Sequence, residues 1–172
     1  MTRVLLVEDD AAIADPLARA LKREGYDVDV FGYFGDSQIG FHGTGGGNIF
    51  VYALRDVTLT ASATSDCSGC YAQIGNGGIF ADGDSGGDIT VNAGRDVTLN
   101  AGTSVYGYAQ IGNGGDSANS GDDAGDIIVM AGGSVALNGD GDDAQIGNGG
   151  YGAPGTDSGG VTVQAIGDVT LT

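Results

Sequence analysis

The heptad AQIGNGG occurs at residues 72–78, 109–115 and 144–150, and SQIGFHG at 37–43 is an altered fourth copy. Each copy sets one isoleucine among glycine and amide residues. A chain with 35 glycines in 172 residues can be disordered. Disordered low-complexity chains, however, do not keep apolar residues at fixed intervals. The recurring heptad therefore indicates a repeat fold.

The repeat extends well beyond the heptad. Two strand-like segments, such as DITVNA and DVTLN, follow each copy, and variable Gly/Asp/Ser segments connect them. The repeat divides the chain after residue 36 into four units, which are 37–71, 72–108, 109–143 and 144–172.

Alignment of the units gives aliphatic residues at equivalent positions in all four. Three further columns run through residues 49, 51 and 53 and their counterparts. The apolar residues alternate along each strand, as burial of one face requires. No unit can bury its own face, so the pattern predicts a mainly β fold, a parallel β-solenoid of about four coils. The three principal columns are Ile39, Ile74, Ile111 and Ile146; Val57, Val97, Val135 and Val169; and Leu59, Leu99, Leu137 and Leu171.

The heptad itself reads as a strand followed by a corner. Its isoleucine would fill the core, and its asparagine and glycines would supply positive-φ conformations at the corner. The glutamines would point outward, where stacked amides can bond from coil to coil. A glycine-rich phosphate cradle is the rival interpretation, and it lacks the helix and lysine that such a site needs. The predicted outward column is Gln38, Gln73, Gln110 and Gln145.

Residues 37–172 resemble the repeats of filamentous-haemagglutinin-type adhesins, through YAQIGNGG, GDITVNAGRDVTLNAG and GDVTLT. The resemblance implies a right-handed parallel β-helix in a secreted or cell-surface protein. It also implies a structural shaft with a cell-surface or matrix partner.

Residues 1–36 have a different pattern and predict a short β-α-β segment with a junction. RVLLV reads as a buried strand, Asp10 as a helix N-cap, and YDVDVF as a second strand. Ile13, Leu17 and Leu21 recur at every fourth position and form one apolar stripe on the helix between them. A solenoid exposes core side chains at each end, so we expect this stripe to cap the first coil.

The first 30 residues resemble the start of a bacterial response-regulator receiver domain. Asp9 and Asp10 follow the VLLV strand, where the resemblance implies an acidic pocket that binds Mg²⁺. Asp56 lies at a suitable distance for a phospho-acceptor, but RDVTL recurs at 95–99, so Asp56 belongs to the repeat. No lysine follows Lys22, so the phosphotransfer site cannot be completed. The abrupt change of pattern suggests a fusion or chimera.

The charge excludes several partners. The formal net charge is −17, and only two of the six basic residues, Arg55 and Arg95, follow residue 23. Such a surface repels phosphate backbones and anionic lipid, so we expect no nucleic-acid partner. No apolar run is long enough to cross a membrane. The N-terminal apolar stretch is too short for a secretion signal, and an acidic cluster follows it, so the N-terminus looks cytoplasmic.

The remaining motifs do not amount to a catalytic centre. Cys67 and Cys70 form CSGC, which is half of a four-ligand zinc site and lies in a Gly/Ser/Thr loop. Acidic loops such as ADGDSGGD could attract Ca²⁺ but match neither an EF-hand nor a calcium roll. His42, the single histidine, has no nucleophile partner in its motif. We therefore expect no enzyme and no obligate cofactor.

The sequence supports two hypotheses for the function. The first is a structural or adhesive module that self-associates, as a dimer or filament, through the uncovered edge of its last coil. The second is a remnant of a two-component response regulator that keeps part of the acidic pocket.

Overall fold

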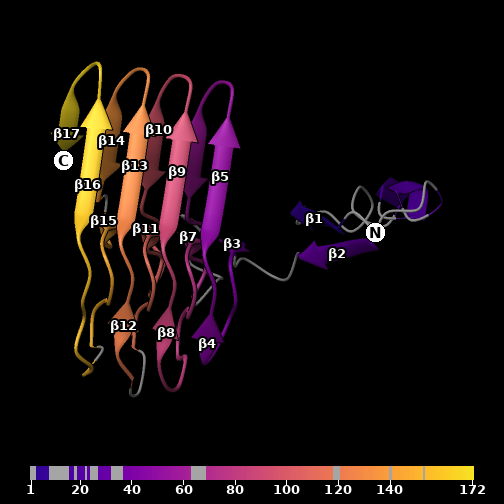
Figure 1. Ribbon diagram of the computed structural model, residues 1–172. Coiled ribbons are helices and arrows are strands. Elements are labelled where there is room, and N and C mark those ends of the chain that lie inside the picture. Colours follow the sequence, from indigo (N-terminus) through magenta and orange to yellow (C-terminus); the bar gives the residue numbers. More distant parts are fainter. Residues whose placement is uncertain are drawn as a thin grey trace.

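A parallel β-solenoid dominates the computed structural model (Figure 1). Short strands alternate with glycine-rich corners, and each coil lies on the previous one. The fold is mainly β, as the repeat predicted. The structure describes residues 3–7, 16–17, 19–21, 23, 27–31, 37–62, 69–117, 121–139, 141–152 and 154–172.

Four sheets run along the solenoid, and every strand pair in them is parallel. One sheet consists of the strands at the start of each heptad: β3 (Ser37–Ile39), β7 (Ala72–Ile74), β11 (Ala109–Ile111) and β15 (Ala144–Ile146). A second sheet consists of short corner strands: β4 (Gly45–Gly46), β8 (Ser85–Gly86) and β12 (Asp123–Ala124). The other two sheets carry the longer strands: β5 (Ile49–Ala53), β9 (Ile89–Ala93), β13 (Ile127–Ala131) and β16 (Val161–Ala165); β6 (Val57–Thr60), β10 (Val97–Asn100), β14 (Val135–Asn138) and β17 (Val169–Leu171).

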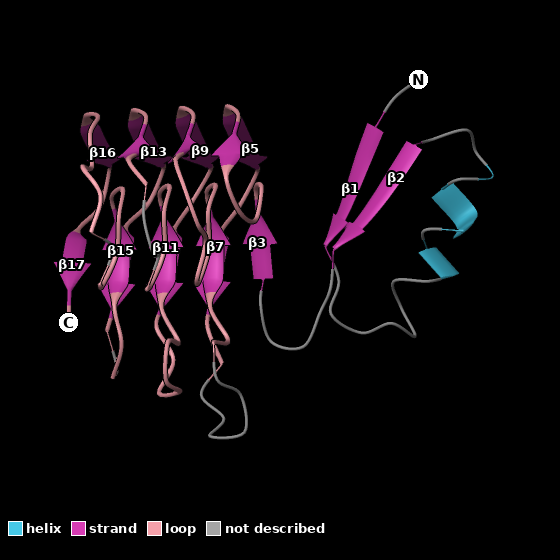
Figure 2. Ribbon diagram, turned by 90° about the horizontal axis from the view of Figure 1, so that it is seen from below, coloured by secondary structure: helices cyan, strands magenta, loops and turns pink. Residues whose placement is uncertain are grey.

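The predicted columns are confirmed by the register of these sheets. Ile74 pairs with Ile39 on one side and with Ile111 on the other, and Ile111 pairs with Ile146. The Val57 and Leu59 columns continue in the same register through β10, β14 and β17. Like side chains therefore lie one coil apart, about 4.8 Å in parallel sheets. Figure 2 shows the same strands side by side in successive coils.

One continuous hydrophobic core fills the solenoid. Ile111, Val97 and Val135 have no exposed surface, whereas Thr98 on the same strand as Val97 is partly exposed. The alternation follows from strand geometry, because successive side chains point to opposite faces.

A separate pair of strands precedes the solenoid. β1 (Arg3–Val7) and β2 (Asp27–Phe31) are parallel, with Arg3 opposite Asp27 and Val7 opposite Phe31. Residues 16, 17, 19–21 and 23 between them are helical. Strand, helix and strand therefore follow in the predicted order. No described helix is long and apolar enough to cross a membrane.

Candidate functional site

The glutamines of the heptad lie inside the solenoid, so the prediction that they point outward is wrong. Gln38, Gln73 and Gln110 are buried, and Gln145 on the last coil is half-buried. Gln73 Nε2 donates to the carbonyl oxygen of Gly112, one coil on, at 2.9 Å. Each such bond gives a hydrogen-bond donor to a backbone carbonyl oxygen at the corner that has no partner within the sheet. An inward orientation of the glutamine side chain is therefore favoured.

Two asparagines of the heptad, Asn76 and Asn113, are also buried, Asn148 on the last coil is half-buried, and none of the three adopts positive φ. Among the described residues other than glycine, only Phe80, Tyr106 and Ser117 do. Asn113 is fully buried, and its Oδ1 accepts a bond of 3.0 Å from the backbone N–H of Asn76. The asparagine is thus a polar core residue that links consecutive corners.

The glycine after each isoleucine is needed for close approach between coils. A Cβ on Gly75 would lie 1.7 Å from the carbonyl oxygen of Gly112, and one on Gly112 would lie 1.8 Å from that of Gly147. The following glycines do supply the predicted positive φ, as Gly77 shows with 103°. The heptad therefore repeats because the interior of every corner is the same.

An amide ladder of the expected kind runs along the outer surface at a different position. Asn100 Nδ2 donates to Thr60 Oγ1 at 3.1 Å, and Asn138 Nδ2 donates to Asn100 Oδ1 at 2.8 Å. Thr172 Oγ1 continues the ladder with a bond of 3.0 Å to Asn138 Oδ1.

Many of the aspartates have a structural role at the corners. The Asp88 carboxylate accepts the backbone N–H of Asp126 at 3.1 Å, and Asp126 accepts that of Gly160 at 2.7 Å. Asp56 likewise accepts the backbone N–H of Asp96 and also pairs with Arg95 Nε at 3.1 Å. These carboxylates bond the backbone of the next coil. Across the described ranges, no group of three or more His, Cys, Asp or Glu side chains is arranged to hold a metal ion.

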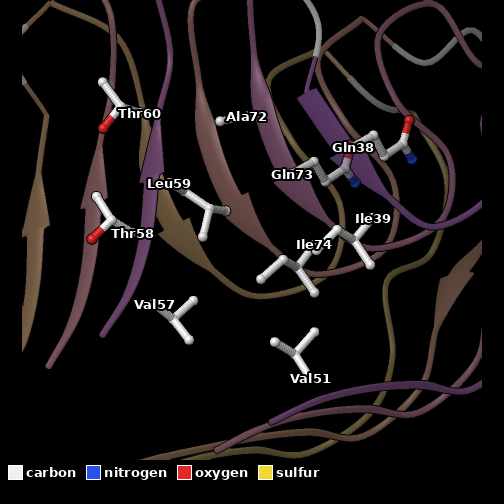
Figure 3. Close-up of a pocket in the computed structure, with 10 residues that line it drawn as sticks. All are labelled: Gln38, Ile39, Val51, Val57, Thr58, Leu59, Thr60, Ala72, Gln73 and Ile74. Atoms are coloured by element: carbon white, nitrogen blue, oxygen red, sulfur yellow. The ribbon is translucent and has the colours of Figure 1, made fainter. Parts of the chain in front are cut away.

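The first coil leaves a hollow of about 360 Å³ at its end of the core, which we call the first-coil hollow. Figure 3 shows Ile39, Val51 and Leu59 directed toward a common space, with Thr58 and Thr60 pointing away. The residues around it are Gln38, Ile39, Val51, Val57, Thr58, Leu59, Thr60, Ala72, Gln73 and Ile74.

The expected cap is not seen over this hollow, and it stays a prediction. No described residue before Gln38 lines the hollow. Leu17 exposes 42% of its surface and Leu21 is half-buried. Ile13 lies outside the described residues, as do Asp9 and Asp10, the candidate Mg²⁺ ligands.

The fourth coil exposes the other end of the core. Val161, Val169 and Leu171 are 48%, 52% and 74% exposed. Their counterparts one coil earlier, Ile127, Val135 and Leu137, are 0%, 0% and 9% exposed. Burial in this fold thus depends on a neighbouring coil at each face. The candidate interaction site consists of two coil ends, the exposed face at β15–β17 and the first-coil hollow, which no described residue before Gln38 lines.

Cys70, one of the two cysteines of the CSGC motif, is oxidised. Cys70 is buried and disulfide-bonded, and no free cysteine is found in the described part of the chain. The other cysteine of the chain, Cys67, lies outside the described residues.

Comparison of the chain with protein-family models, curated proteins and solved structures finds no match. The class that the structure defines is therefore that of its fold, a parallel β-solenoid.

Proposed function

We propose that this protein is a non-catalytic structural module, of adhesin type, that assembles end to end through its open coils. The observation that carries the proposal is the exposed apolar face of the fourth coil. Unpaired strand edges with apolar side chains are templates for addition of further strands. A second copy of this chain is the natural occupant, because it would continue the same columns.

The first-coil hollow supports stacking in a head-to-tail sense. Its walls carry Ile39, Val57 and Leu59, the counterparts of Ile146, Val169 and Leu171 on the other end. Both ends therefore present the same rows of side chains at the same spacing. Contact through one end gives a dimer, and contact through opposite ends gives an open filament.

An adhesive role has separate support on the outer face of β5 and at Leu54, directly after this strand. Phe50, Tyr52 and Leu54 are 76%, 73% and 80% exposed along one edge of the solenoid. Aromatic side chains on a surface are typical of protein-protein contact sites. A cell-surface or matrix partner would meet the shaft here.

Sedimentation equilibrium on two lysine variants of β17 tests the assembly. Leu171→Lys places a charge on the open end, and Thr170→Lys places the same charge on the outward face of the same strand. Burial of a leucine contributes about 1.5–3 kcal/mol, so Leu171→Lys should weaken association at least about tenfold. Thr170→Lys should leave it unchanged. A wild-type protein that stays monomeric at high concentration would contradict the proposal.

A response-regulator remnant is the second candidate, favoured by the parallel pairing of β1 and β2 with helical residues between them. Asp56 does not support phosphotransfer, because its Oδ1 already accepts a hydrogen bond from the backbone N–H of Asp96 and pairs with Arg95 Nε. Mass spectrometry after incubation with a small phosphodonor separates the candidates. A stable aspartyl phosphate would favour the second, and the structural proposal expects none.

A further inference from the structure

A second hollow, of about 410 Å³, lies among the loops of the later coils and reaches the fourth coil at Tyr151. We call it the tyrosine–aspartate hollow. Segments of three coils line it: residues 103–106, Asp116 with residues 141–143, and Tyr151. Its size lies within the range of about 300–1,000 Å³ that is typical of small-molecule sites.

A column of tyrosines stops at the hollow, where Asp143 takes the next position. Tyr71 and Tyr108 stack one coil apart, with ring centroids 4.8 Å apart and an interplanar angle of 6°. Each precedes the alanine of its heptad, and the residue that precedes Ala144 in the next coil is Asp143. Beside Tyr108 lies a separate and much smaller hollow, of about 10 Å³, which shares Asp116, Asp143 and Tyr151 with the tyrosine–aspartate hollow.

Asp116 lines the tyrosine–aspartate hollow and has one carboxylate oxygen in a described hydrogen bond. Only 6% of its surface is exposed, and its Oδ1 accepts a bond of 2.6 Å from Ser117 Oγ. No donor among the described residues bonds to Oδ2. Burial, more than the nearby charges of Asp142 and Asp143, raises the pKa of Asp116, and the Ser117 bond opposes this. A cation at Oδ2 would relieve both the burial cost and the repulsion.

Aromatic rings supply the other walls of the hollow. Tyr151 is 73% exposed. Tyr106 is held in place by an edge-on contact with Phe80, with centroids 5.5 Å apart. Faces of tyrosine rings attract cations and cover alkyl chains. None of the described basic side chains lines the hollow to neutralise its carboxylates.

The chemistry favours an organic cation over a metal ion. Ca²⁺ takes six to eight oxygen ligands, and these carboxylates do not form a metal-holding group. We propose that the tyrosine–aspartate hollow binds a protonated amino group, with Asp116 Oδ2 as its acceptor and with Tyr106 and Tyr151 covering the attached alkyl chain. This binding role goes beyond the structural function and does not depend on end-to-end assembly.

Heteronuclear NMR titration of the full chain with n-butylammonium tests the proposal, with n-butanol as the neutral isostere. The amine should shift the resonances of Tyr106, Asp116 and Tyr151, and the alcohol should not. Asp116→Asn should weaken amine binding about tenfold or more, the size expected for loss of a charge-assisted hydrogen bond. Asp88→Asn removes the same charge outside the hollow and should leave the affinity within about twofold.

Two further measurements test the aromatic wall of the hollow and the source of the amine. Tyr151→Ala removes an exposed ring and is compatible with folding, so it should weaken binding even if Asp116→Asn fails to fold. An Nα-acetyl-lysine amide tested beside the free amine identifies the source: tighter binding of the lysine derivative indicates a protein side chain, and tighter binding of the free amine indicates a small molecule. Equal loss in Asp116→Asn and Asp88→Asn, or equal binding of the alcohol, would overturn the proposal.

Discussion

The carboxyl group of Asp123 is the most unfavourably placed charge in the described part of the solenoid. It occupies β12 with 3% of its surface exposed, and no described donor bonds to its oxygens. Burial, followed by the charges of Asp157, Asp122 and Asp84, raises its pKa from 3.8 to about 6. The equivalent residue on β8 is Ser85. We therefore expect that Asp123→Ser, which copies the preceding coil, stabilises the protein at neutral pH.

The magnitude follows from linkage between protonation and folding. Because the folded pKa lies above the unfolded value, ionisation of Asp123 costs stability as pH rises from about 4 to about 6, and the cost is constant above that range. A rise of the pKa from 3.8 to about 6 corresponds to about 3 kcal/mol. Asp123→Ser should therefore raise the free energy of unfolding by up to about 3 kcal/mol near pH 8 and by almost nothing near pH 4.

Urea unfolding of wild type and variant at both pH values measures this difference, with the slope of each transition checked for two-state behaviour. Asp157→Asn serves as a second variant, because it removes only a neighbouring charge. It should give a smaller gain at neutral pH, since burial is the larger cause of the shift. A loss of stability in Asp123→Ser near pH 8, or a gain that does not change with pH, would refute the reasoning.

Three more substitutions test the corner and the core by urea unfolding. Gln110→Leu should cost about 1–3 kcal/mol, because the carbonyl oxygens of Gly147 and Gly149 lose their shorter bonds and keep only the longer ones from Gln145, and an unchanged midpoint would contradict this role. Gly112→Ala should prevent stacking of the coils, because its Cβ would meet a carbonyl oxygen at 1.8 Å, whereas Gly47→Ala, with no atom within 4 Å, should be tolerated. Ile111→Ala should cost about 2–5 kcal/mol and Ile146→Ala clearly less, because only the former is fully buried; equal losses would contradict the difference between inner and end coils.

The architecture could be predicted from the sequence because the same pattern of residues recurs in every coil of the solenoid. Every coil places an aliphatic residue at the same position, so Ile39, Ile74 and Ile111 identify both the inward face and the register. The strand pattern inside each unit adds the alternation that distinguishes a half-buried strand from a loop.

The polar interior could not be predicted from residue type alone. Glutamine and asparagine are usually found at protein surfaces. Only the positions of the neighbouring backbone carbonyls show why the amides of Gln73 and Asn76 are favoured inside the solenoid. One signal was available: an outward glutamine has little reason to stay the same in all four copies of the heptad. Asp116 and Tyr151 were missed because they come together from different coils through variable loops. The aligned units do show that Asp143 replaces the tyrosine found at this position in the two preceding units, and this difference could have been noticed in the sequence.

Methyl NMR on isoleucine-labelled protein tests the stacked register most directly. The account predicts nuclear Overhauser contacts between Ile39 and Ile74, between Ile74 and Ile111, and between Ile111 and Ile146. It predicts none between Ile39 and Ile111, which lie two coils, about 10 Å, apart. Missing contacts between successive coils, or isoleucine methyl groups with the shifts of an unfolded chain, would contradict the solenoid and with it both proposed binding surfaces.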